Sequence, residues 1–157
     1  MSKIYIHKTS IIDEPVEIGS GTKIYHHSHI RENVKIGQNV NIGKNVYIDK
    51  GVVIGDNCKI QNNVSIYTGV NVGNNVFIGP SVTFTNDLYP SVNEWTEEKI
   101  VKTTIEDNVS LGANSTIICG IILGNNCLIG AGSVVTKSIN PGMIAYGNPA
   151  SEIKKRI

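Results

Sequence analysis

The residues best suited to acid–base chemistry in this sequence are its four histidines, which all lie near the N-terminus: His7, His26, His27 and His29. An imidazole is the side chain that enzymes use most often as a general base. Three of these histidines fall within one hexapeptide, and on a flat strand successive side chains point to opposite faces. They cannot all face one ion, so we expect no metal site.

Other polar residues stand at separations that are multiples of 18. The positions of His26 and Asn62 differ by 36, and those of Tyr67 and Thr85 differ by 18. If the path of the chain repeats with a period of 18, each pair lies in one column.

Asn86 and Asp87 follow directly and are the candidate catalytic residues. An amide oxygen can hold an amine through a hydrogen bond, and a carboxylate can accept a proton. Both residue types are also common where a loop begins, so an ordinary turn is the alternative interpretation.

A hexapeptide repeat supplies the elements that would position these residues. Aliphatic residues recur every six positions, and a second inward series follows each of them by four, as in IGQNVN, IGKNVY and IGDNCK. This period fits neither a helix nor an alternating strand. It fits a triangular coil of three hexapeptides, in which Gly and Asn occupy the corners because they tolerate left-handed backbone angles. Stacked coils would bury one continuous aliphatic column. The first series comprises Ile6, Ile12, Ile18, Ile24, Ile30, Ile36, Ile42, Ile48, Ile54, Ile60, Ile66, Val72, Ile78 and Phe84.

The repeat is interrupted once. After Phe84 the register fails until Ile105, and the interval between them, 21, is not a multiple of six. Residues 85 to about 104 must therefore leave the coil as a loop. Beyond Pro141 the repeat ends, and we expect residues 150–157 to form a short C-terminal helix that covers the end of the stack. The whole chain, 1–157, is then a single β-helix domain.

Composition excludes several partners. The formal net charge is +1 and charged residues make up 17%, which leaves no basic field for nucleic acid. No apolar run approaches the length of a membrane span, and the N-terminus lacks a signal peptide, so we expect a cytoplasmic protein without a membrane partner. The cysteines, Cys58, Cys119 and Cys127, have unrelated spacings that argue against disulfides and zinc.

Handedness does not follow from spacing, but a resemblance supplies it. The repeats and the ending GMIAYGNPASEIKKRI resemble the hexapeptide acyltransferase family, which implies a left-handed parallel β-helix and a homotrimer with active sites between subunits. The segments IYHHSHI, KIQNNVSIY, IGPSVTFTND, LGANSTIICG and GAGSVVTK are similar to bacterial N-acetyltransferases that act on the amino group of nucleotide-linked 3-amino sugars. This resemblance implies acetyl-CoA as co-substrate, a dTDP- or UDP-linked amino sugar as acceptor, and a role in surface polysaccharide synthesis such as that of lipopolysaccharide.

The same resemblance assigns roles to the candidates. The matching segments contain four residues that would bind the substrate: His26, Asn62, Tyr67 and Thr85. Ala113 and Ala131 would leave backbone amides open to the pantetheine arm of CoA, although Gly-Ala pairs also suit tight corners. Lys137 lies toward the same end of the stack and would meet the phosphates of CoA as a charge-assisted donor, although solvation at the surface also explains a lysine there. Asn86 would hold the amine, amides near Ala113 would stabilise the oxyanion, and Asp87, water or the CoA thiolate would take the proton.

Two other functions stay open at this point. One is O-acetylation of a sugar or small alcohol, which the absence of a histidine near the loop disfavours. The other is a non-catalytic scaffold, since repeats specify shape and not chemistry.

Overall fold

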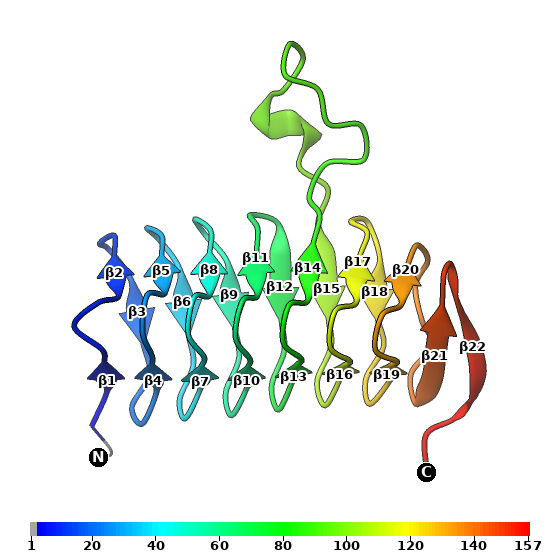
Figure 1. The fold of residues 1–157 in the computed structure, drawn as a ribbon, viewed down its shortest axis with the longest axis horizontal. Coiled ribbons are helices and arrows are strands. Elements are labelled where there is room, and N and C mark those ends of the chain that lie inside the picture. Colours follow the sequence, from blue (N-terminus) through cyan, green and yellow to red (C-terminus); the bar gives the residue numbers. More distant parts are fainter. Residues whose placement is uncertain (1–2) are drawn as a thin grey trace.

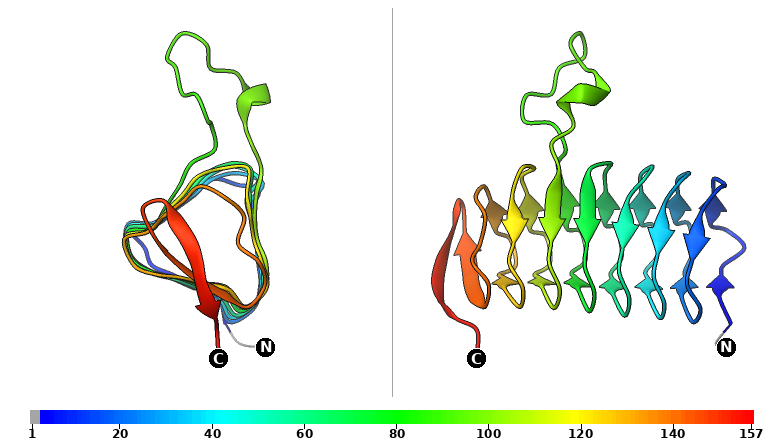
Figure 2. Two further views of the ribbon diagram at one scale, coloured as in Figure 1. Left: turned by 90° about the vertical axis from the view of Figure 1, so that its right-hand side faces the viewer. Right: turned by 180° about the vertical axis from the view of Figure 1, so that it is seen from behind.

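The computed structural model describes residues 3–157, and these form a left-handed parallel β-helix (Figure 1). Three parallel sheets make the faces of a triangular prism, which is visible along its axis in Figure 2. Residues 18 apart pair directly: Lys59, for example, lies between Asn41 and Phe77. The period predicted from the sequence is confirmed.

The strands alternate among the three sheets in chain order. Sheet A contains β1 (Tyr5–Ile6), β4 (Lys23–Ile24), β7 (Asn41–Ile42), β10 (Lys59–Ile60), β13 (Phe77–Ile78), β16 (Ser110–Leu111), β19 (Leu128–Ile129), β21 (Met143–Gly147) and β22 (Ala150–Lys155). Sheet B contains β2 (Ile11–Ile12), β5 (His29–Ile30), β8 (Tyr47–Ile48), β11 (Ser65–Ile66), β14 (Thr83–Phe84), β17 (Thr116–Ile117) and β20 (Val134–Val135). Sheet C contains β3 (Glu17–Ile18), β6 (Lys35–Ile36), β9 (Val53–Ile54), β12 (Val70–Val72), β15 (Thr103–Ile105) and β18 (Ile122–Leu123).

We number the coils by their sheet A strand, so that coil 1 begins at β1, coil 2 at β4, coil 3 at β7, coil 4 at β10, coil 5 at β13, coil 6 at β16 and coil 7 at β19. Edge AB is the set of turns that lead from sheet A to sheet B, such as residues 25–28 and 112–115. Edge BC is the corresponding set from sheet B to sheet C, such as residues 49–52 and 67–69.

The interior is the predicted aliphatic column. Isoleucines from Ile24 to Ile78 are at most 4% exposed, and Phe84 is buried with them. Corner residues adopt left-handed angles as expected, for example Asn45 with φ of 54°. The column is less complete in coil 1, where Ile6 is 41% exposed because no coil lies below it. Cys58, Cys119 and Cys127 are buried free thiols.

The loop leaves the prism at edge BC between β14 and β15, and contains one short 3-10 helix, η1 (Glu97–Lys99) (Figure 1). The coil resumes at Thr103, slightly earlier than expected. Phe77 pairs with Ser110, so the stack continues in register above the loop.

The predicted C-terminal helix is wrong. Residues 150–155 form β22, which pairs antiparallel with β21, and Figure 2 shows this hairpin across the end of the stack. The reason is that β19 leaves backbone groups unpaired at the end of sheet A, and β21 satisfies them as a further strand. Gly147, at φ of 112°, then allows the chain to turn back on itself. Within residues 3–157, no helix is long and apolar enough to cross a bilayer.

Candidate functional site

The candidate residues divide between two edges of the prism. His26, Asn62, Ala113 and Ala131 lie on edge AB, in coils 2, 4, 6 and 7. Tyr67, Thr85, Asn86, Asp87 and Lys137 follow sheet B strands on edge BC. Sheet B separates the two groups within one chain.

Asn86 is fixed where the loop leaves coil 5. Its Nδ2 donates a hydrogen bond to the Thr68 carbonyl oxygen at 3.3 Å, and its own carbonyl oxygen accepts one from the Val101 N–H at 2.9 Å. The first bond orients the side-chain amide, and the second closes the neck of the loop. With Nδ2 directed at Thr68, Oδ1 is the atom of this amide that is left to accept a further donor.

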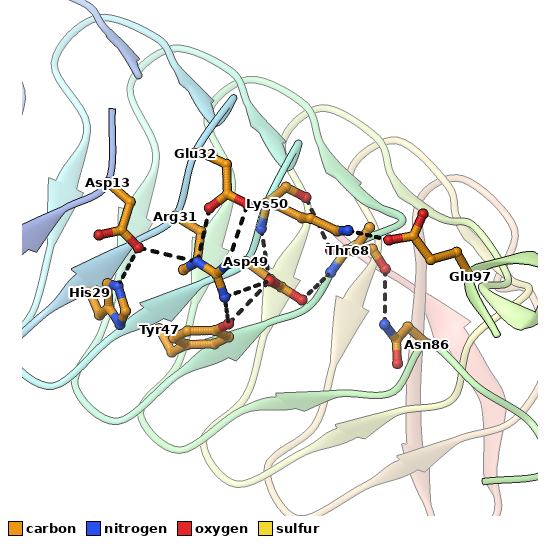
Figure 3. Close-up of polar contacts among 10 residues, drawn as sticks. All are labelled: Asp13, His29, Arg31, Glu32, Tyr47, Asp49, Lys50, Thr68, Asn86 and Glu97. Atoms are coloured by element: carbon orange, nitrogen blue, oxygen red, sulfur yellow. Dashed lines mark hydrogen bonds and ion pairs between the residues drawn. The ribbon is translucent and has the colours of Figure 1, made fainter. Parts of the chain in front are cut away.

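Asp49 holds the turn that carries Thr68 (Figure 3). Its carboxylate accepts hydrogen bonds from the Lys50 N–H at 2.8 Å, the Thr68 N–H at 3.3 Å and the Tyr47 hydroxyl at 3.1 Å. Burial by itself would raise the pKa of Asp49, but these hydrogen bonds outweigh it and hold the pKa below its usual value. Asp49 is therefore an ionised anchor one coil below Thr68 and two coils below Asn86.

The network of polar contacts around Asp49 continues through Tyr47 toward coil 1. His29 Nε2 lies 2.8 Å from Asp13 Oδ2, and Arg31 Nε lies 3.2 Å from the same oxygen (Figure 3). Arg31 also donates to Glu32 at 2.9 Å and to the Tyr47 hydroxyl at 3.4 Å. Bonding to Tyr47 and Glu32 raises the pKa of Arg31, so it stays a cation whose charge is matched by carboxylates.

A pocket of about 290 Å³ opens between this chain of contacts and the loop. Arg31, Lys50, Asn86, Trp95 and Ile100 are among its lining residues. Lys50 forms an ion pair with Glu97 of η1, which ties the loop to coil 3 (Figure 3). Loop and coil together therefore form the walls beside Asn86.

The neighbouring candidates on edge BC have different surroundings. The hydroxyl of Thr85 accepts a hydrogen bond from the Cys119 N–H at 2.9 Å, which connects coil 5 to coil 6. Asp87 Oδ1 accepts from the Tyr89 N–H, whereas its Oδ2 is buried without a partner among the described residues. Tyr67 is 37% exposed beside Tyr47.

His26 and Asn62 come together as expected. Both line one pocket of about 460 Å³ on edge AB, formed by coils 2 to 4. The imidazole of His26 stacks on that of His7, with ring centroids 3.5 Å apart. Burial and the neighbouring His26 lower the pKa of His7, so this stack favours the neutral form of the His7 ring.

Ala113 and Ala131 lack the cap that another corner of their edge has. On edge AB the Lys44 N–H donates to Asn62 Oδ1 of the next coil at 2.9 Å, and on the edge between sheets C and A the Gln38 N–H donates to Asp56 Oδ1 at 2.7 Å. One coil after Ala113 the equivalent residue is Ala131, whose methyl group accepts nothing. Within residues 3–157, the N–H groups of both alanines donate to no oxygen, and so they are available to a ligand.

Lys137 does not lie beside the alanines of its own chain. It lies on the other side of sheet B, in a pocket of about 390 Å³ with Thr136, Ser138 and Glu152. Arg156 is engaged elsewhere, since it donates to the carbonyl oxygen of Cys127 at 3.1 Å. Neither cation of a single chain therefore reaches the alanine corner.

Sequence reasoning missed the contacts of Asp13, His29, Arg31 and Asp49. A signal was present, because three of the pairs stand at the period of 18: His29 with Tyr47, Arg31 with Asp49, and Asp13 with Arg31. Outward positions carry no hydrophobic period, so the repeat does not single these residues out.

Two family models match the chain. One is described as "Bacterial transferase hexapeptide (six repeats)" and matches residues 15–50 and 51–86. The other, "Hexapeptide repeat of succinyl-transferase", matches residues 33–68 and 102–137. Together these ranges cover more than half of the sequence, on the coils that build both edges. The chain belongs to the hexapeptide-repeat transferase family.

Relatives of this hexapeptide-repeat transferase act on more than one acceptor. The galactoside O-acetyltransferase of Lactococcus lactis is 38% identical over 82 residues, which are 50% of this chain and 39% of that protein. The dTDP-3-amino-3,6-dideoxy-alpha-D-galactopyranose 3-N-acetyltransferase of Aneurinibacillus thermoaerophilus is 47% identical over 53 residues, which are 34% of this chain and 28% of that protein. The matches span less than half the length of these curated relatives.

A solved structure shares the fold of the hexapeptide-repeat transferase. A mutant of perosamine N-acetyltransferase from Caulobacter crescentus, in complex with CoA and GDP-perosamine, has a TM-score of 0.56 and 19% identity. The similarity covers 98% of this chain and 58% of that chain. It establishes a common β-helix.

Proposed function

We propose that this chain is an acetyl-CoA-dependent N-acetyltransferase that acetylates the 3-amino group of a dTDP- or UDP-linked amino-deoxy sugar. The observation that carries the proposal is the environment of Asn86. Its amide presents Oδ1 as an acceptor beside a pocket, and all four histidines of the sequence lie on coils 1 and 2. His29, on β5, is three strand spacings from β14, which is about 14 Å.

This environment suits an amine better than a hydroxyl. A neutral amine is already a good nucleophile, whereas a hydroxyl needs a base to remove its proton. The amine nitrogen attacks the thioester carbon of acetyl-CoA while Asn86 Oδ1 accepts one of its N–H groups. Positioning is then the main contribution of the protein.

The remaining steps balance as follows. The carbonyl oxygen becomes an oxyanion that the free N–H of Ala113 stabilises, and collapse of the intermediate breaks the C–S bond. The amine proton passes to the departing CoA thiolate, to water or to Asp87, whose Oδ2 lacks a partner among the described residues. CoA leaves as the thiol.

In this proposal Tyr67 and Thr85 bind the sugar, and Lys137 binds the phosphates of CoA. His26 and Asn62 contribute to the nucleotide sugar from edge AB. The acetyl-CoA-bound amides and the acceptor-binding Asn86 are on different edges, which supports a site shared between copies of the chain. A closed homotrimer with its axis parallel to the stack would keep the coils level and bring edge AB of one copy to edge BC of the next.

The test is a screen for release of free CoA thiol from acetyl-CoA. Purified protein is offered dTDP- and UDP-linked 3-amino, 4-amino and 2-amino sugars, with galactosides as hydroxyl acceptors. We expect turnover with 3-amino sugars. Absence of thiol release with every amino sugar would overturn the proposal.

O-acetylation is the second candidate, and the Lactococcus lactis galactoside O-acetyltransferase is the observation in its favour. Turnover on galactosides alone would establish it in place of N-acetylation. A cytoplasmic location and a role in surface polysaccharide synthesis stay predictions.

A further inference from the structure

The edge AB pocket contains two cations whose charges are not matched by acids. Its lining consists of Tyr25, His26, Asn41, Gly43, Lys44, Lys59, Ile60, Gln61 and Asn62, and no carboxylate is among them. Neither Lys44 nor Lys59 belongs to any of the ion pairs formed within residues 3–157. Both lysines are exposed.

The pocket beside Asn86 has the opposite electrostatic character. Its Arg31 is paired with Asp13 and Glu32, and its Lys50 is paired with Glu97. Asp49 also lines it. An anion that entered there would have to displace carboxylates, whereas the edge AB pocket offers free positive charge.

Side-chain amides add hydrogen-bonding groups to the edge AB pocket. Asn62 Oδ1 is occupied by the Lys44 N–H, which leaves Asn62 Nδ2 to donate. Gln61 adds a second amide at the same corner. Tyr25 and His26 border the pocket with ring surface that can pack against a planar base. Two cations, amide donors and ring surface are the chemistry that recognises a nucleoside diphosphate.

We propose that this pocket binds the pyrophosphate and base of the nucleotide sugar, with Lys44 and Lys59 on the pyrophosphate oxygens. The inference rests on the proposed function and adds the position of the acceptor substrate. Coils 3 and 4 carry the lysines, coil 5 carries Asn86, and coil 6 carries Ala113. If two copies of the chain are aligned along the stack axis, the pyrophosphate and the amine are one or two coil spacings apart along that axis, which is about 5–10 Å. One sugar ring can bridge this distance.

CoA also contains a pyrophosphate, so the experiment must separate the two sources. Calorimetry measures the Kd of dTDP, UDP and CoA for the whole protein and for the variants Lys44→Gln and Lys59→Gln. Lys23→Gln is the matched control, because Lys23 is an exposed lysine on sheet A outside the pocket. Circular dichroism checks that each variant is folded.

We expect each pocket variant to weaken dTDP or UDP binding about tenfold, with CoA binding and the Lys23→Gln control unchanged. Added salt should weaken nucleotide binding less in the variants than in the parent protein. Unchanged nucleotide affinity, or weakened CoA affinity, would overturn the assignment. If either result is found while the parent protein still acetylates amino sugars, the proposed function stands and only the assignment of this pocket is wrong. A parent protein that neither binds dTDP or UDP nor acetylates amino sugars refutes both the pocket and the proposed function.

Discussion

At the scale of single residues, the orientation of one amide decides what Asn86 can do. The Thr68 carbonyl oxygen accepts from Nδ2, so Oδ1 is the atom available to an amine. A free Oδ1 is what the proposed role of Asn86 requires, and substitution of Asn86 tests that role.

Replacing Asn86 by alanine should lower kcat about 100-fold, because the amine loses the group that aligns it. The KM for acetyl-CoA should change little. Steady-state thiol release measures both, and Asn71→Ala, at an exposed position on β12, is the control. Unchanged kcat in Asn86→Ala would refute the role.

Asp49 is expected to act through Asn86. Asp49→Asn keeps the shape but weakens the acceptor for the Thr68 N–H, so the Thr68 turn shifts and kcat should fall about tenfold. In an Asn86→Ala background the same substitution should cost no further activity, because the two residues act as a unit. Asp56→Asn, which weakens a comparable cap on another edge, should leave kcat unchanged. Additive losses in the double variant would contradict the coupling.

Asp49 should also contribute stability that depends on pH. Its pKa is lower in the folded protein than the ordinary value of 3.8, so its contribution is present above about pH 4 and is lost as the pH falls through the lowered pKa. Denaturant unfolding of the parent protein and of Asp49→Asn should therefore differ most at neutral pH and converge as the pH falls below 3.8 and through the lowered pKa. A difference that grows on acidification would contradict the sign.

At the scale of elements, side-chain caps decide which corner amides are open to a ligand. The Lys44 N–H on edge AB is satisfied by Asn62 of the coil above, and the Gln38 N–H, on the edge between sheets C and A, is satisfied by Asp56. Small residues in the sequence indicated the corner, but only the cap geometry shows that the amides of Ala113 and Ala131 stay free.

Ala131→Asn should restore the missing cap by placing an amide oxygen over the Ala113 N–H, as Asn62 does for Lys44. We expect kcat to fall about 100-fold, because an oxyanion donor is lost, while Tm stays equal or rises. Ile122→Asn, on the exposed face of β18, is the control. Full activity in a folded Ala131→Asn protein would show that this amide is not used.

The parts of the fold that depend on buried residues were predictable from the sequence. A strict period predicts the buried positions from Ile24 to Ile78 and at Phe84, because inward positions tolerate only apolar side chains. The break in the same period predicts where the loop departs. Handedness required a resemblance, and the C-terminal hairpin was missed because SEIKKRI has no period of its own. The Asp13, His29 and Asp49 contacts were missed because outward side chains are selected by chemistry that the repeat does not encode.

At the scale of the whole molecule, the separation of edges AB and BC makes a single chain incomplete for the proposed reaction. Asn86 and the amide of Ala113 belong to neighbouring coils but to different edges. The assembly that would join them can be tested without any structure of the oligomer.

When chains that carry only Asn86→Ala are coexpressed with chains that carry only Ala131→Asn, the mixed oligomers should recover activity. A site that takes edge AB from one copy and edge BC from another is intact in about one quarter of random pairings. Thiol release near that fraction of the parent activity is expected from the mixture, and none from chains that carry both substitutions. A mixture as inactive as its components would place both residues in a site within one chain.

The loop between β14 and β15 has a further consequence for how this scaffold can diversify. Its neck is closed by the bond between Val101 and Asn86, and the strands on either side pair as if nothing intervened. Insertions and deletions at the tip therefore leave the stacked interior untouched. The segment can therefore be exchanged, by evolution or by grafting, without a change in the pairing of the coils on either side.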